Sequence, residues 1–324
     1  MNINARTISA DDIDFAAYLA ATEAQQKVRP AKDFGAELLD HVFGSRPDPK
    51  NFLPWPKTQK LIQFRPGEVT LWAGINGHGK SLLTGQVGLS LMGQGERVCV
   101  ASFEMKPRKT LYRIGRQWAG MPPDNENDTE DMREQSRDML AQFFDWTDGK
   151  LWLYDQQNTV KTEVILGVAK YCAQELKCSH IFIDSLMKCV KGEDDYNGQK
   201  DFVDELCAIA KDSNTHIHLV HHIKKLQDED RMPGKFDAKG SGAISDQVDN
   251  FLVVFRNKKK ERAIESGKGA PADEPDSFLI CHKQRETGWE GCIGLYVDKE
   301  SMQFKESPFD RAVNFNEWPH RPWS

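Results

Sequence analysis

Long apolar runs, a basic leader and an excess of positive charge are all missing from this 324-residue sequence. No segment approaches the roughly 18 consecutive apolar residues that a helix needs to cross a bilayer. The first residues, "MNINARTISADDIDF", lack the basic start and apolar block of a secretory signal. We therefore expect a protein of the cytoplasm with no membrane partner.

Paired cysteines are also missing. The seven cysteines form no CxxC motif, and several lie in apolar stretches that resemble strands or helices. Reduced thiols buried in a core are typical of cytosolic proteins, in which disulfides are rare. The sequence therefore favours neither a disulfide framework nor a cysteine-bound metal.

The formal net charge is −6. Proteins that hold nucleic acid through a uniformly basic surface carry the opposite balance. Any nucleic-acid site must then be local, in a few loops, or must be built by several subunits together.

Residues 1–55 differ in character from the rest of the chain. The stretches "DDIDFAAYLAATEAQQKVR" (11–29) and "FGAELLDHVFG" (34–44) predict two short amphipathic helices. Four prolines then interrupt residues 45–59. We interpret residues 1–55 as a helical arm and linker, because so short a segment cannot bury its own core.

Strands and helices alternate from about residue 61 to residue 223, which predicts a mainly parallel sheet with helices on both faces. Strands alone are expected after residue 249, as an antiparallel extension. The charged stretch at residues 256–277 between two of these late strands is interpreted as a solvated loop, with Lys258, Lys259 and Lys260 exposed. The expected α/β domain spans residues 56–305, and residues 306–324 form a tail.

The stretch "GINGHGKS" (74–81) fits the phosphate-binding pattern GxxxxGK[ST] without a mismatch, between a predicted strand and a predicted helix. Glycines let backbone N–H groups face a phosphate, and the helix presents its positive end to it. Lys80 is expected to neutralise the β and γ phosphates, and Ser81 to bind Mg²⁺. The residues predicted to contact the nucleotide are Gly74, Asn76, Gly77, His78, Gly79, Lys80, Ser81 and Leu82.

Hydrolysis needs a second metal anchor and a group that orients water. Asp184 ends the apolar strand "IFIDS", and Glu104 ends the strand "RVCVASFE". Because parallel strands end on the same edge of a sheet, we expect both carboxylates beside the phosphate loop. Asp184 then supports Mg²⁺, and Glu104 polarises the attacking water.

Four histidines lie in "HIHLVHHIKK" (216–225). Metal ligands are one interpretation, but no cysteine or carboxylate lies nearby at the spacing of a zinc site. We favour structural roles for His216 and His218. His222, at the strand end, is predicted to sense the γ phosphate.

The order of these motifs resembles that of the RecA-like motor domain of ring-shaped replicative DNA helicases, a family that includes DnaB, the bacteriophage primase–helicases and Twinkle. The resemblance spans about residues 60 to 305. It is carried by the phosphate loop, Glu104, "FIDS" and His222, followed by "KGSGAISDQVDNFLVVFRN" and "KQRETGWEGCIGLYVD". It implies a RecA-like P-loop NTPase core.

The resemblance also implies a homo-hexameric ring that hydrolyses ATP with Mg²⁺ between subunits and moves along single-stranded DNA, usually 5′ to 3′. Lys283 and Arg285 match the basic pair that reaches the γ phosphate of the neighbouring subunit, and Arg256 matches a position that stacks on adenine. Apolar Phe34, Leu38, Leu39, Val42 and Phe43 of the arm are expected to dock on the adjacent subunit. A separate primase or polymerase is the expected partner, and a lone motor domain favours a phage- or plasmid-encoded protein in a bacterial host.

The sequence departs from the family at one position. Asp246 stands where the family usually has a glutamine that links nucleotide state to the DNA loops, and Gln247 follows it. Two loops match those that hold DNA near the ring axis, at residues 188–200 and 223–240. The second is the more basic, with the candidate DNA-binding residues Lys224, Lys225, Arg231, Lys235 and Lys239.

Two other interpretations stay open. A recombination ATPase similar to RadA would form filaments on DNA without unwinding a fork. An ATP-switched helicase loader or regulator would have less need of a water-orienting Glu104.

Overall fold

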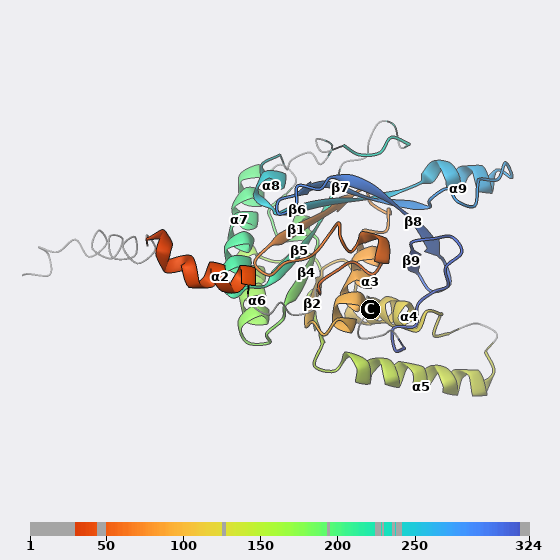
Figure 1. Cartoon of the computed structure of the whole chain (residues 1–324). Helices are drawn as coiled ribbons and strands as arrows, with labels where there is room; N and C mark the ends of the chain where they lie inside the picture. The colour runs from red at the N-terminus through yellow and green to blue at the C-terminus, as the bar shows by residue number, and fades with distance from the viewer. Residues whose placement is uncertain are drawn as a thin grey trace, which may run out of the picture. The chain divides into compact units, whose positions relative to one another are not determined.

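Nine strands of the described residues form one sheet, in the order β3-β2-β4-β5-β1-β6-β7-β8-β9 (Figure 1). The structure is a computed structural model, and it describes residues 30–43, 50–124, 128–192, 195–223, 228, 230–234, 237 and 242–317. The chain divides into two units, Met1–Pro49 and Lys50–Ser324. In the described part of the first unit, a 3-10 helix η2 (Ala31–Phe34) leads into helix α2 (Gly35–Phe43), as the sequence predicted for this stretch. The other predicted arm helix, at 11–29, lies outside the described residues.

The parallel part of the sheet comprises β1 (Val69–Gly74), β2 (Val98–Ser102), β3 (Leu151–Tyr154), β4 (His180–Asp184), β5 (His216–His222) and β6 (Asn250–Arg256). The three late strands β7 (Ser277–Gln284), β8 (Gly291–Asp298) and β9 (Gln303–Lys305) are antiparallel. Both the parallel core and its antiparallel extension confirm the predicted fold class. The central strands are apolar along most of their length, because helices cover them on both faces.

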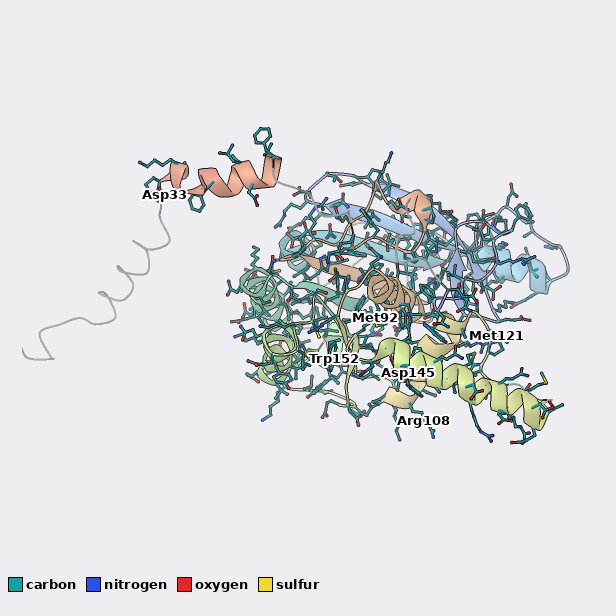
Figure 2. All side chains as sticks on the ribbon, turned by 60° about the horizontal axis from the view of Figure 1, so that its bottom comes forward. Asp33, Met92, Arg108, Met121, Asp145 and Trp152 are labelled. Carbon is teal, nitrogen blue, oxygen red and sulfur yellow. The ribbon has the colours of Figure 1, made fainter. Side chains whose placement is uncertain are left out.

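Helices cover both faces of the sheet (Figure 1). On one face lie α6 (Thr162–Gln174), α7 (Tyr196–Ser213) and the short α8 (Gly242–Gln247), over a core that includes Leu71, Ile183 and Phe251. On the other lie α3 (Lys80–Gly93), α4 (Pro107–Ala119) and α5 (Glu130–Thr147), over a core that includes Trp72 and Phe182. Figure 2 shows Met92 of α3 inside this unit and Arg108 of α4 at its rim. Short 3-10 helices, η3 (Pro56–Thr58) and η4 (Leu186–Lys188), complete the described elements together with α9 (Lys258–Glu265).

The domain begins earlier than the sequence predicted. Leu53 and Trp55 are buried in the core, and the indole N–H of Trp55 donates to the carbonyl oxygen of Phe304 at 2.7 Å. The compact unit therefore starts at Lys50 and not at residue 56. At the other end, Phe315 is buried and its N–H donates to the carbonyl oxygen of Trp118, so that described residues of the expected tail pack on the unit.

Two segments differ from the sequence-based interpretation. The stretch 256–277 is not wholly a loop, because it contains α9, whose N-terminus is capped by the Asn257 side chain accepting from the N–H of Lys260. Lys260 is buried and forms an ion pair with Asp276 at 2.8 Å, so it is not the exposed residue that was expected. Helix α5 was not predicted, although Thr129 caps it by accepting from the N–H of Met132. No helix in the described ranges is long and apolar enough to cross a membrane.

Candidate active site

The loop at residues 74–81 joins β1 to α3 (Figure 1). It turns at Gly77 and Gly79, both of which have a positive φ. A Cβ on Gly74 would lie 2.6 Å from the carbonyl oxygen of Val254 on β6, which is too close for any side chain. Gly79 has a φ of 87° directly before Lys80, the first residue of α3. Both positions require glycine, since L-residues rarely adopt that conformation and Gly74 has no room. The loop thus presents backbone N–H groups at the N-terminus of α3.

Lys80 is 4% exposed and folds back over its own loop. Its Nζ donates to the carbonyl oxygens of Gly74 at 2.7 Å and Ile75 at 3.0 Å. Burial, partly offset by the carboxylates of Asp184 and Glu104, lowers the pKa of Lys80 to about 8. A bound polyphosphate would supply the negative charge that a buried ammonium group lacks.

Ser81 and Asp184 meet across the edge of the sheet. The Ser81 hydroxyl donates to Oδ2 of Asp184 at 2.5 Å. Oδ1 of Asp184 is buried and has no hydrogen-bond partner among the described residues, and burial raises the pKa of this carboxyl. Two hard oxygen donors, one of them orphaned and buried, fit the preference of Mg²⁺ for oxygen ligands and retained water.

Glu104 lies beside His222 at the same edge. The two side chains come from the ends of β2 and β5, and Nε2 of His222 donates to Oε1 of Glu104 at 3.1 Å. β4 lies between these strands, with Ser102 opposite Asp184 and Asp184 opposite Val220. The parallel register therefore brings Glu104, Asp184 and His222 together next to the phosphate loop, as their positions at strand ends predicted.

Arg256 ends β6 next to the phosphate loop. Its backbone N–H donates to Nδ1 of His78 at 3.0 Å, and its guanidinium is ion-paired with Glu261 of α9. Burial and three nearby cations, Lys258, Lys80 and Arg256, lower the pKa of His78 to about 4. His78 is therefore a neutral acceptor that joins the loop to β6.

Lys283 and Arg285 lie at the opposite edge of the sheet from the phosphate loop. β7 runs antiparallel to β6, and Gln284 lies opposite Asn250, which pairs with Thr70 near the start of β1. The loop follows the other end of β1, about 17 Å away for five residues of strand. The phosphate loop of this subunit and its basic pair are thus on different sides of the molecule.

Both cations contact the C-terminal end of α8. Nζ of Lys283 donates to the carbonyl oxygens of Ser245 and Asp246 at 2.9 and 2.8 Å. The Arg285 guanidinium donates to Asp246 O at 3.1 Å and to Oδ1 of Asp249 at 2.9 Å. The side chain of Asp246 is exposed, and its backbone carbonyl makes these contacts.

The candidate DNA loop is described only in part. Lys224, Lys225, Lys235 and Lys239 lie outside the described residues. Arg231 is half-exposed and forms an ion pair with Asp237 at 2.6 Å. His282 of β7 contacts the carbonyl oxygen of Pro233 at 3.0 Å, and Arg262 of α9 forms an ion pair with Asp230. These contacts tie the described part of the loop to β7 and α9.

His216 and His218 are buried and structural. The Trp72 indole donates to Nδ1 of His218 at 3.1 Å, so the other nitrogen of His218 carries the proton and donates to Nδ1 of His180 at 3.1 Å. His216 donates from Nδ1 to the carbonyl oxygen of Arg65 at 2.6 Å. Across the described ranges, no group of three or more His, Cys, Asp or Glu residues is arranged to hold a metal ion.

Sequence reasoning missed Asp249. Its carboxylate is 9% exposed and binds Arg285 with one oxygen and the N–H of Val69 with the other, at 2.9 Å each. The signal was weak, since an aspartate before an apolar strand is common. Its partners are 36 and 180 residues away in the sequence.

Known proteins resemble this chain both in sequence and in fold. Residues 58–306 match the family of the DnaB-like helicase C-terminal domain. A structure described as a DnaB-like replicative helicase and its interactions with primase superposes with a TM-score of 0.66 at 14% identity, over 90% of this chain and 70% of that one. A second structure, described as an ATPase domain, superposes with a TM-score of 0.67 at 16% identity, over 85% of this chain and 96% of that one. At these identities the two structures support the RecA-like fold.

Proposed function

We propose, on the premise that this chain belongs to the family of DnaB-like helicase C-terminal domains, that it is the ATP-hydrolysing motor of a DNA helicase. The observation that carries the proposal is the cluster at the phosphate-loop edge. Lys80, Ser81 and Asp184 bring together an ammonium group, a hydroxyl and a carboxylate that would suit a polyphosphate and Mg²⁺, and the Glu104–His222 pair lies beside them.

Each residue of the cluster has a role in hydrolysis. Lys80 exchanges its carbonyl partners for the β and γ phosphates. Ser81 and Asp184 would hold Mg²⁺, which would supply positive charge to the phosphates. Glu104 accepts the proton of the attacking water, and His222 holds this carboxylate in place and responds to the γ phosphate. We propose that Arg256, which ends β6 and bonds to His78 of the phosphate loop, stacks on the adenine of ATP.

The position of Lys283 and Arg285 supports a shared active site. They lie across the sheet from their own phosphate loop, so a neighbouring subunit is needed to bring a second copy of the pair to the γ phosphate. Heterologous contacts of this kind form a ring when the rotation between neighbouring subunits closes, and an open filament when it does not. We propose a homo-hexamer with ATP at each interface, because each site then gains an arginine from the next subunit.

The arm supplies a second contact between subunits in this proposal. Helix α2 and the 3-10 turn before it carry five exposed apolar residues, Phe34, Leu38, Leu39, Val42 and Phe43. Such a face is stabilised by burial on another surface. We propose that it docks on the adjacent subunit. We also propose that the loop at 223–240 contacts single-stranded DNA in the ring. The ring moves along this strand from 5′ to 3′, and a separate primase or polymerase is its partner.

The experiment is an unwinding assay on forked DNA with ATP, using forks with only one single-stranded tail. We expect unwinding only when the 5′ tail is present, together with a hexameric mass when Mg²⁺, an ATP analogue and an oligonucleotide are added. Filaments without unwinding would support a recombination ATPase instead. Nucleotide binding without turnover would support a loader or regulator.

A further inference from the structure

Asp249 stands between two parts of the chain that the proposed mechanism assigns to different active sites. It follows α8 and precedes β6, at the edge of the sheet opposite the phosphate loop. Its side chain is almost fully buried, whereas that of Arg285 is half-exposed. A buried carboxylate that holds an exposed arginine restricts where the guanidinium points.

Four hydrogen bonds converge on this one residue. Its N–H donates to Val69 O at 3.0 Å, and its Oδ2 accepts from Val69 N at 2.9 Å. Its carbonyl oxygen accepts from Arg285 N at 2.9 Å, and its Oδ1 accepts from Nη1 of Arg285 at 2.9 Å. Val69 is the first residue of β1, which leads into the phosphate loop. Asp249 thus connects the strand of one site to the arginine assigned to the next.

A second set of contacts fixes the remaining direction of the guanidinium. Nη2 of Arg285 donates to the carbonyl oxygens of Asp246 at 3.1 Å and Gln247 at 3.4 Å. These carbonyls end α8, and the candidate DNA loop directly precedes that helix. Movement of α8 therefore changes the acceptors of Arg285, while Asp249 keeps the side chain attached to β1.

We infer that Asp249 is a positioning residue for Arg285, holding the guanidinium ready for the γ phosphate of the neighbouring subunit. The inference rests on the proposed function, because it requires Arg285 to act in trans. Asp249 would thus influence hydrolysis without touching the nucleotide. Its bonds to Val69 and Arg285 align the phosphate loop of one site with the arginine of the next.

Asp249→Asn tests the inference selectively. The asparagine oxygen is needed by Val69 N–H, so the amide NH₂ group faces Arg285, where two donors oppose each other. The connection to β1 is kept, and the side-chain bond to the Arg285 guanidinium is lost. Asp276→Asn is a matched control, since Asp276 also accepts from a backbone N–H, that of Val297 at 2.9 Å, and pairs with a cation, Lys260.

The measurement is steady-state ATP turnover of assembled rings on single-stranded DNA. It compares the wild-type chain, Asp249→Asn, Arg285→Ala, the double variant and Asp276→Asn. We expect Asp249→Asn to lower kcat about 10- to 100-fold with KM for ATP unchanged, as a misplaced catalytic group does. The double variant should be no slower than Arg285→Ala alone, because Asp249 acts only through Arg285 and both changes remove the same interaction. Asp276→Asn should keep wild-type turnover.

The outcomes separate the inference from the proposal beneath it. If Arg285→Ala is slow and Asp249→Asn is not, or if the two effects multiply in the double variant, positioning by Asp249 is overturned while the shared site stands. If Arg285→Ala turns over like the wild-type ring, both fall together. Should Asp249→Asn fail to assemble, Asp249→Ser keeps an acceptor for Val69 N–H and is judged by the same comparison.

Discussion

Nε2 of His222 lies 3.1 Å from Oε1 of Glu104, although 118 residues separate the two in the sequence. Because a carboxylate only accepts, the ring N–H donates, and Nδ1 of His222 is left as an acceptor. Nδ1 is buried and has no partner among the described residues. Glu104 therefore has a fixed neighbour on one oxygen, while its other oxygen is available for a water molecule.

Replacing Glu104 with glutamine should abolish turnover and keep nucleotide binding. Glutamine preserves the size of the side chain but accepts a proton poorly, so kcat should fall by roughly 10²- to 10⁴-fold. The measurements are single-turnover hydrolysis and equilibrium binding of ATP. Glu134→Gln, at an exposed position of α5 away from the cluster, is the control for exchanging the two side chains. Hydrolysis at the wild-type rate by Glu104→Gln would remove the general base from the mechanism.

Nucleotide binding should take up a proton at pH 8. The pKa of Lys80 is lowered by burial to about 8 in the free protein, and bound phosphates favour the charged amine. The amine is protonated below that pH, so ATP affinity should weaken as the pH rises through 8. Calorimetry in two buffers of different ionisation enthalpy measures the uptake. Lys80→Met should show none, and equal uptake by that variant would assign the proton to another group.

The buried histidines should destabilise the fold in acid. Burial lowers the pKa of His180 to about 3 and that of His218 well below its usual value. In the unfolded chain these histidines bind protons below their ordinary pKa of about 6.5, whereas in the folded chain they stay neutral. The free energy of unfolding therefore falls as the pH drops below 6.5. His180 alone should cost about 2 kcal/mol between pH 7 and pH 5, because its pKa of about 3 in the fold lies below that range.

Denaturant unfolding of His180→Phe at pH 7 and pH 5 checks this expectation. The variant should lose less stability between the two pH values than the wild-type chain does. Phe182→Leu is the control, since Phe182 stacks on His218 with ring centroids 4.0 Å apart and does not titrate. It should lower stability equally at both pH values. A pH dependence unchanged in His180→Phe would mean that this ring is protonated in the fold.

Removing residues 1–49 should weaken assembly without unfolding the second unit. The apolar face of α2 is exposed, with Leu39 at 59%, and docking would bury it. Sedimentation with Mg²⁺ and an ATP analogue should show smaller species at concentrations where the full chain forms rings. Leu39→Ser should act in the same direction, and Asp40→Ser, at an exposed neighbouring position, should not. Unchanged assembly of the truncated chain would exclude docking by the arm.

Local sequence pattern was enough to predict most of the fold and the residues that lie around the phosphate loop. The phosphate loop is contiguous, and Glu104, Asp184 and His222 each end an apolar strand, so parallel pairing alone brings them together. Helix α5 was missed because few of its residues are buried, which leaves little apolar pattern. Helix α9 was missed because its lysines suggested a loop, although Lys260 is buried through its contact with Asp276.

Partners distant in the chain were beyond sequence reasoning. The four bonds of Asp249 depend on β1, β6 and β7 meeting at one edge, and no local spacing reports that meeting. The same holds for the carbonyl oxygens of α8 that Lys283 contacts. The order of motifs predicted that Arg285 acts at the active site of a neighbouring subunit. Its contacts with Asp249 and with the end of α8 could be seen only in the structure.

Turnover by Arg285→Ala in assembled rings on single-stranded DNA tests the shared active site most directly. Removing a cation supplied in trans should lower kcat by about 10³-fold or more. ATP binding and ring mass should stay as in the wild-type protein, because the guanidinium is half-exposed and Asp249 keeps its bond to the N–H of Val69 when the guanidinium is removed. Rings of Arg285→Ala that hydrolyse ATP at the wild-type rate would contradict the account.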